Sequence, residues 1–88
     1  MRDMLTQKNH DKIISATNWE EETKWLLKAE LSRRKISHQK LAELLNQMGI
    51  EASKASIDSK LSRGTFGAVF LLQCLRAIGC DKLRIIPE

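Results

Sequence analysis

The sequence predicts an all-α fold, a bundle of four to five helices followed by a short extended C-terminal tail. Three observations favour this fold class. Apolar residues share helix faces along the chain, hydroxyl or amide residues that cap helix starts precede several of these segments, and glycines follow them. Only Leu83-Arg84-Ile85-Ile86 has an extended pattern, and one strand cannot form a sheet alone.

Length and composition indicate one small globular domain. The chain has 88 residues, of which 42% are hydrophobic and 30% charged, a balance typical of folded chains. Residues 1–16 show no clear periodicity and are expected to form an N-terminal arm or a poorly ordered lead-in, which leaves residues 17–88 as the domain. The start lacks the apolar run of a signal peptide and no segment reaches the length of a membrane span, so we expect a cytoplasmic protein.

The first predicted helix begins after Asn18, whose side chain can cap it, with Glu21 three residues on as the partner of a capping box. It is expected to end near Arg34. Its apolar surface consists mainly of Trp25, Leu27, Ala29 and Leu31, and we expect the tryptophans to lie in the core in preference to forming a platform for stacking bases. The cluster Arg33-Arg34-Lys35 either complements the negative end of the helix dipole or contacts phosphate.

The second predicted helix follows Ser37, an N-cap residue, and ends at Gly49. Ile36 and Leu41 have the spacing of a hydrophobic staple. The small Ala42 would allow a close approach of the next helix, which a larger side chain would prevent.

The third predicted helix runs from its N-cap Ser53 to Arg63, with Gly64 as its stop. Ile57 and Leu61 are four residues apart and share the face that would be buried. The other face combines short hydroxyls with cations, a mixture that can hydrogen-bond phosphate oxygens and base edges: Lys54, Ser56, Ser59, Lys60 and Arg63. An ordinary solvated helix face would have the same composition, so the neighbouring helices decide the interpretation.

The fourth predicted helix begins near Thr65, a possible N-cap, and ends at Gly79. It is apolar on nearly every side, from Phe66 to Ile78, and must be buried by the other helices or by another subunit. The tail that follows either packs on the bundle or pairs with a partner chain.

No metal or cofactor is expected. Cys74 and Cys80 are six residues apart, outside the CxxC spacing, and Cys74 falls on the apolar helix, which favours a reduced core thiol. His10 and His38 are far from both cysteines in the sequence and follow no zinc spacing.

The second and third helices have the order of a helix-turn-helix, which predicts a contact with double-stranded DNA. The net charge of +4 favours a polyanionic partner. The Ser53–Arg63 helix would enter the major groove with its N-terminal part toward the bases. The candidate DNA-binding residues are Lys54, Ser56 and Ser59 near base edges, Lys60, Arg63 and Gln39 on phosphates, and Ser53 at the helix start.

Residues 37–79 resemble the Cro/repressor-type helix-turn-helix superfamily, through Ser37-x-x-x-Leu41-Ala42, Gly49 and Leu61-Ser62-Arg63-Gly64. More closely, the segment from Trp25 to Leu83 is similar to a small bacterial domain family without assigned function. That similarity rests on Lys60-Leu61-Ser62-Arg63-Gly64-Thr65-Phe66 and Phe70-Leu71-Leu72-Gln73-Cys74-Leu75-Arg76-Ala77-Ile78-Gly79. The resemblance implies a fold more firmly than an activity.

The chain departs from the superfamily pattern at two places. About ten residues usually separate the small alanine from the buried apolar residue of the recognition helix, whereas Ala42 and Ile57 are 15 apart, so the second helix or the turn must be longer. The position three before Leu41, where the superfamily often has glutamine, is His38, and Gln39 is shifted by one.

The predicted function is sequence-specific DNA binding by a small bacterial, phage or plasmid transcriptional regulator. A domain of this size makes few contacts, so a homodimer is expected, through Leu83–Ile86 or through the apolar fourth helix. The main alternative is a protein-interaction module, such as an antitoxin or an adaptor subunit, although the third helix lacks the large aromatic anchors of protein interfaces. An enzyme is the least favoured class, because no histidine is placed by the sequence as a base for Ser56 or Ser59, and no phosphate-binding glycine loop is present.

Overall fold

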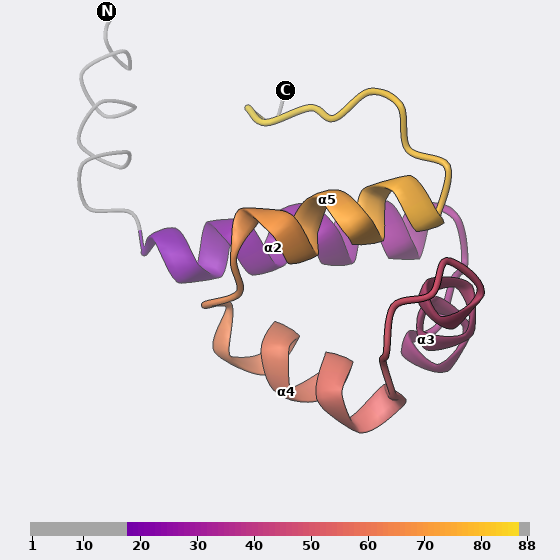
Figure 1. Cartoon of the computed structure of the whole chain (residues 1–88). Helices are drawn as coiled ribbons and strands as arrows, with labels where there is room; N and C mark the ends of the chain where they lie inside the picture. Colours follow the sequence, from indigo (N-terminus) through magenta and orange to yellow (C-terminus); the bar gives the residue numbers. More distant parts are fainter. Residues whose placement is uncertain (1–17, 87–88) are drawn as a thin grey trace, which may run out of the picture.

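The computed structural model describes residues 18–86 and contains four helices. These are α2 (Trp19–Arg33), α3 (His38–Gln47), α4 (Lys54–Arg63) and α5 (Ala68–Ala77), followed by an extended tail (Figure 1). The part of the chain described contains no strand, which confirms the all-α prediction of a small helical bundle. The arm predicted over residues 1–16 lies outside the described residues.

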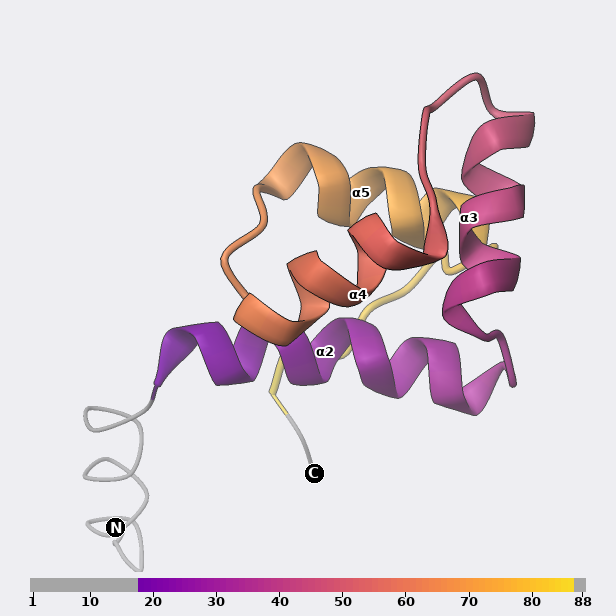
Figure 2. The ribbon, with the colours of Figure 1, turned by 90° about the horizontal axis from the view of Figure 1, so that it is seen from below.

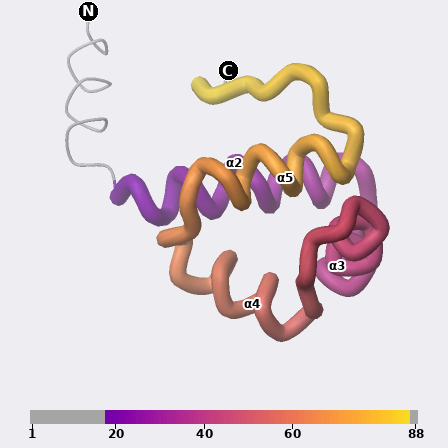
Figure 3. The backbone as a smooth tube through the Cα atoms, in the orientation of Figure 1, coloured from indigo at the N-terminus to yellow at the C-terminus, as the bar shows by residue number. Residues whose placement is uncertain are grey.

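The four helices form a short bundle. In Figure 2, α2 and α5 run roughly along the same direction, with α4 lying across the space between them. Helix α3 runs across the end of the bundle where α2 finishes. The tail returns on the side of the bundle opposite to α4 (Figure 3). None of the helices within residues 18–86 is both long enough and apolar enough to cross a membrane.

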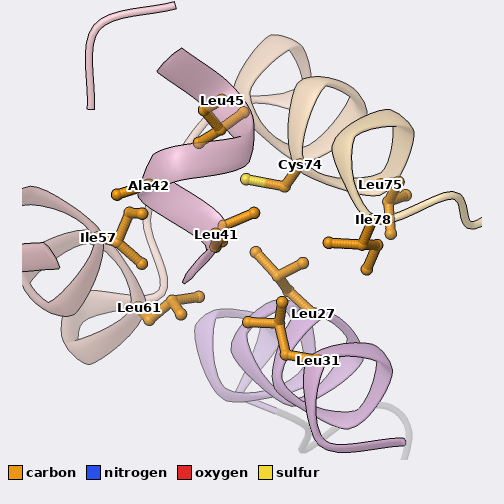
Figure 4. Packing of buried hydrophobic residues seen from close by; sticks show 10 residues of the cluster. All are labelled: Leu27, Leu31, Leu41, Ala42, Leu45, Ile57, Leu61, Cys74, Leu75 and Ile78. Carbon is orange, nitrogen blue, oxygen red and sulfur yellow. The ribbon is translucent and has the colours of Figure 1, made fainter. Parts of the chain in front are cut away.

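All four helices contribute to one hydrophobic core (Figure 4). Each helix buries residues that lie three or four positions apart, as amphipathic helices do. Ala42 is only 2% exposed and faces Ile57 of α4 in Figure 4, which agrees with the predicted close approach of α3 and α4. The buried cluster consists of Leu27, Leu31, Leu41, Ala42, Leu45, Ile57, Leu61, Cys74, Leu75 and Ile78.

The predicted N-caps of α2 and α3 are confirmed, whereas the Glu21 side chain does not complete the predicted capping box and instead accepts a hydrogen bond from Lys24 Nζ at 2.8 Å. Asn18 Oδ1 accepts a hydrogen bond from the backbone N–H of Glu21 at 3.2 Å, and Ser37 Oγ accepts one from Lys40 N–H at 3.0 Å. Helix α2 ends at Arg33, one residue before the predicted end. Gly49 follows α3 with a φ of +81°, a left-handed conformation that glycine adopts without strain and that ends the helix.

The prediction that the tryptophans lie in the core is wrong. Trp19 is 64% exposed and Trp25 is 47% exposed. Leu27 and Leu31 are the residues of α2 that face the core, and because successive helix positions are about 100° apart, Trp25 lies on the far side of the helix from them. The buried polar residue of α2 is instead Glu30, which no sequence argument singled out.

The start of α5 also differs from the prediction. Its N-cap is Gly67, and no side chain caps it, so Thr65 does not begin the helix. Phe66 lies in the preceding loop and meets the edge of the Phe70 ring, with 5.3 Å between ring centroids. Two apolar residues of α5 are exposed in the single chain, Val69 by 72% and Leu72 by 60%. The described chain therefore leaves part of the α5 surface uncovered.

The first part of the tail packs on the bundle. Leu83 is half-buried against the core, whereas Ile85 and Ile86 are 67% and 70% exposed. Of the two expectations for this segment, packing on the bundle therefore holds for Leu83.

Candidate nucleic-acid interface

Helix α4 begins with two reciprocal hydrogen bonds between Ser53 and Ser56. The Ser53 hydroxyl accepts from the backbone N–H of Ser56 at 3.1 Å, and the Ser56 hydroxyl accepts from the backbone N–H of Ser53 at 3.0 Å. The Ser56 hydroxyl also donates to the Ser53 carbonyl oxygen at 2.9 Å. Both serines are predicted DNA-binding residues, and both already satisfy the first turn of α4, so their first role is to fix where this helix starts.

Asp58 connects α4 to the start of α3. Its Oδ2 accepts a hydrogen bond from Lys54 Nζ at 2.8 Å, and its Oδ1 lies 2.5 Å from Nδ1 of His38. These two partners, Lys54 first and His38 second, lower the pKa of the Asp58 carboxyl, which is therefore ionised at neutral pH. Part of the positive charge predicted for α4 is consequently compensated within the chain.

The pairing of His38 with Asp58 is the contact that sequence reasoning missed. The pairing of Lys54 with Asp58 could have been predicted from the sequence, because a lysine and an aspartate four residues apart on a helix can pair. The pairing of His38 with Asp58 joins residues 20 apart in the sequence and depends on how α3 crosses α4, which no local sequence pattern predicts.

The C-terminal half of α4 carries the cations that remain. Arg63 and Ser59 are exposed, and Arg63 makes no hydrogen bond or ion pair with the other described residues. Lys60 is half-buried, and its ammonium group lies 5.2 Å from the centroid of the Phe70 ring. A cation over an aromatic face is held by the ring quadrupole, so Lys60 contributes to the attachment of α4 as well as to its charge.

Gln39 is exposed in the first turn of α3, and its amide donates to Glu43 Oε2 at 3.4 Å. The neighbouring His38 side chain, rather than that of Gln39, contacts α4. The structure thus brings Lys54, Ser56, Ser59, Lys60 and Arg63 together on one helix, with Gln39 on the adjacent one.

The connection between α3 and α4 contains the extra residues that the spacing of Ala42 and Ile57 required. It spans residues 48–53, whereas α3 itself has only ten residues. The backbone N–H of Ile50 donates to the Leu45 carbonyl at 3.0 Å, and that of Ala52 donates to Asn46 Oδ1 at 3.1 Å. Ile50 and Ala52 also pack against the core. The long turn is therefore held by its own hydrogen bonds and apolar contacts.

The end of α4 is pressed against the start of α2. Gly64 is buried and has a φ of +69°, and a Cβ atom built on it would lie 2.3 Å from the backbone oxygen of Glu20. Lys24 of α2 reaches the same end of α4, where Nζ donates to the Ser62 carbonyl oxygen at 3.5 Å. Glycine was predicted at this position as a helix stop, but the close approach of two backbones is a second reason for it.

The two cysteines do not form a disulfide. Cys74 is fully buried, as predicted, and burial raises the pKa of its thiol to about 12. Cys80 is half-buried at the start of the tail. Within residues 18–86 no three side chains of the metal-binding types gather at one place.

Comparison with known proteins gives one match. No curated protein and no solved structure matches the chain significantly. The family described as "Domain of unknown function (DUF6471)" matches residues 19–83, a range that includes all four helices and the half-buried Leu83. Because the match covers well over half of the chain, the protein belongs to this family of domains of unknown function.

Proposed function

We propose that the protein binds double-stranded DNA through the outer face of α4, as a small bacterial, phage or plasmid transcriptional regulator. The supporting observation is how α4 is attached. Ile57 and Leu61 are almost completely buried, at 0% and 1% exposure, whereas Lys54, Ser59 and Arg63 are exposed. A helix that is anchored along one face and carries hydroxyls and cations on the other can enter a major groove.

The contacts between α3 and α4 support the same proposal. The His38–Asp58 pair fixes the first turn of α3 against the middle of α4, so Gln39 and the α4 side chains keep a constant spacing. Gln39, Lys60 and Arg63 would hold phosphates, while Lys54 and Ser59 would lie near base edges. Asp58 could accept from a cytosine amino group once Lys54 turns to the DNA.

The direct test is fluorescence anisotropy with the upstream DNA of its own gene and with a scrambled duplex, each at low and near-physiological salt. Tighter binding to the native duplex that survives added salt supports a sequence-specific regulator, because phosphate contacts alone weaken steeply with salt. Equal affinity for both duplexes, abolished by salt, would contradict sequence-specific binding.

A paired variant tests whether α4 is the binding element. Lys60→Met with Arg63→Gln removes two cations, and the methionine keeps an apolar stem over Phe70. If both cations contact phosphate, duplex affinity falls, and the slope of log K against log salt concentration becomes shallower by roughly two. The control, Lys28→Gln with Arg76→Gln, removes two exposed cations from α2 and α5. Equal affinity of the two double variants would exclude α4 as the contact.

A protein-interaction module is the second candidate function, as an antitoxin or an adaptor subunit. The observation in its favour is that Lys54 is already paired with Asp58, so only Lys60 and Arg63 of the α4 cations have no carboxylate partner within the helix. Absence of binding to any duplex at low salt would favour this candidate over DNA binding.

A further inference from the structure

We propose that the outer face of α2 pairs with the same face of a second copy of the chain, the two helices running antiparallel. The proposal goes beyond DNA binding and does not depend on it. The surface concerned is a cleft between α2 and the tail that is open to solvent. Its lining combines an indole and small apolar groups with four cations and one carboxylate: Trp25, Leu26, Ala29, Glu30, Arg33, Arg34, Lys82 and Arg84.

Four residues of α2 form one stripe, of which Leu26, Ala29 and Arg33 line this cleft and Glu22 continues the stripe toward the start of the helix. Glu22, Leu26, Ala29 and Arg33 follow one another at intervals of four, three and four, the spacing of residues that face a partner helix. The buried Leu27 and Leu31 point to the other side of α2. Beside the stripe, Trp25 is 47% exposed, so a large apolar residue is left partly in water.

The charges along α2 are divided between its two ends. The first turn is acidic, with Glu20, Glu21 and Glu22, and Arg33 is the basic residue of its last turn. The side chain of Arg33 is 63% exposed. The tail adds Lys82 and Arg84 to the wall of the cleft that Arg33 lines. An antiparallel partner would therefore meet opposite charge at both ends.

One register satisfies the whole stripe. With Glu22 opposite the partner's Arg33, Leu26 lies opposite the partner's Ala29, so a large side chain meets a small one. The two-fold symmetry repeats both contacts, as an isologous interface requires. The stripe is about 16 Å long at 1.5 Å per residue, so we expect a small interface and an association in the micromolar range.

This self-complementarity is what favours a second copy over an unrelated acidic peptide. The same helix supplies the acid and the base at matching positions, which a foreign ligand would not require. The exposed apolar residues of α5, Val69 and Leu72, lack this feature, because Arg76 is the only charged residue of that helix.

Charge reversal tests the proposal. The mass of the full chain is measured by sedimentation velocity from low micromolar to several hundred micromolar concentration, and the wild type is expected to form a concentration-dependent dimer. Glu22→Arg and Arg33→Glu each place like charges in contact twice, so each variant alone stays monomeric. An equimolar mixture restores both ion pairs in a mixed dimer and the dimer returns. The two reversed positions face each other there, and so do the two unchanged positions.

Two controls keep the result unambiguous. Leu72→Glu alters the exposed face of α5 and should leave the dimer unchanged. Arg33 also pairs with Glu30 at 2.6 Å, so thermal melting followed by circular dichroism checks that the variants fold, and Ala29→Gln blocks the stripe without touching that pair. A wild type that stays monomeric overturns the proposal. So does a dimer that survives the α2 substitutions or is lost with Leu72→Glu, and so does a mixture of folded variants that stays monomeric.

Discussion

Replacing Gly64 by alanine tests whether the contact between α4 and α2 stabilises the fold. Two costs add. The φ of +69° is strained for any residue with a Cβ, which costs about 1 kcal/mol, and the new Cβ would lie 2.3 Å from the backbone oxygen of Glu20. Backbone atoms cannot turn away as a flexible side chain can, so relieving the overlap should cost roughly 1–3 kcal/mol more. We expect a total loss of about 2–4 kcal/mol in the free energy of unfolding.

Gly49→Ala is the matched control, because it isolates the first cost. Gly49 has a similar φ of +81°, but a Cβ there would meet nothing within 4 Å. Its variant should lose only about 1 kcal/mol, or roughly 4–8 °C in melting temperature. Urea denaturation and thermal melting of both variants measure the difference. If Gly64→Ala is no less stable than Gly49→Ala, the close approach of α4 to α2 does not contribute to stability and this reasoning is wrong.

Three further predictions concern single groups. Burial raises the pKa of Cys74 to about 12, so its thiol should react with a thiol reagent far more slowly than that of Cys80, and equal reaction rates would contradict this. The stability that the buried neutral thiol confers is present below pH 9 and is lost as the pH rises toward 12. In urea denaturation, the stability difference between the wild type and Cys74→Ala should therefore shrink over that pH range. Hydrogen bonds from Arg33 and, second, from Arg34 lower the pKa of Glu30. The ionised carboxylate therefore stabilises the fold above the ordinary carboxyl pKa, and this stabilisation is lost in acid. A difference in unfolding free energy between the wild type and Glu30→Gln that stays constant from neutral pH to acid would contradict this role. Ser53→Ala should lower the unfolding free energy by about 1 kcal/mol through loss of the α4 cap, and an unchanged urea midpoint would argue against that role.

The helix boundaries were predictable because their causes are local. Asn18 and Ser37 cap their helices as predicted, and Gly49 ends α3 in a left-handed conformation. Thr65 failed as a cap for a reason that is not local. The chain leaves α4 at Gly64 beside α2, and it reaches the α5 position only after Gly67.

The candidate site was predictable in composition but not in contacts. The outward cations and hydroxyls of α4 followed from the two anchors Ile57 and Leu61. The bond between His38 and Asp58 depends on the crossing of two helices, and the burial of Glu30 depends on side chains that meet only after folding, including Cys80 from the tail. A tryptophan is usually counted as a core residue because of its size, so the exposure of Trp25 needed the three-dimensional arrangement.

The two surfaces proposed to bind partners, the outer face of α4 and the outer face of α2, lie on different sides of the bundle. Glu20 and Lys24 contact the end of α4, whereas Leu26, Ala29 and Arg33 of the stripe line the cleft that the tail borders. In Figure 1 the tail and α4 likewise lie on opposite sides of the bundle. Pairing through α2 would therefore cover neither copy of α4. A dimer would carry two exposed α4 helices, and each proposal could fail without removing the support for the other.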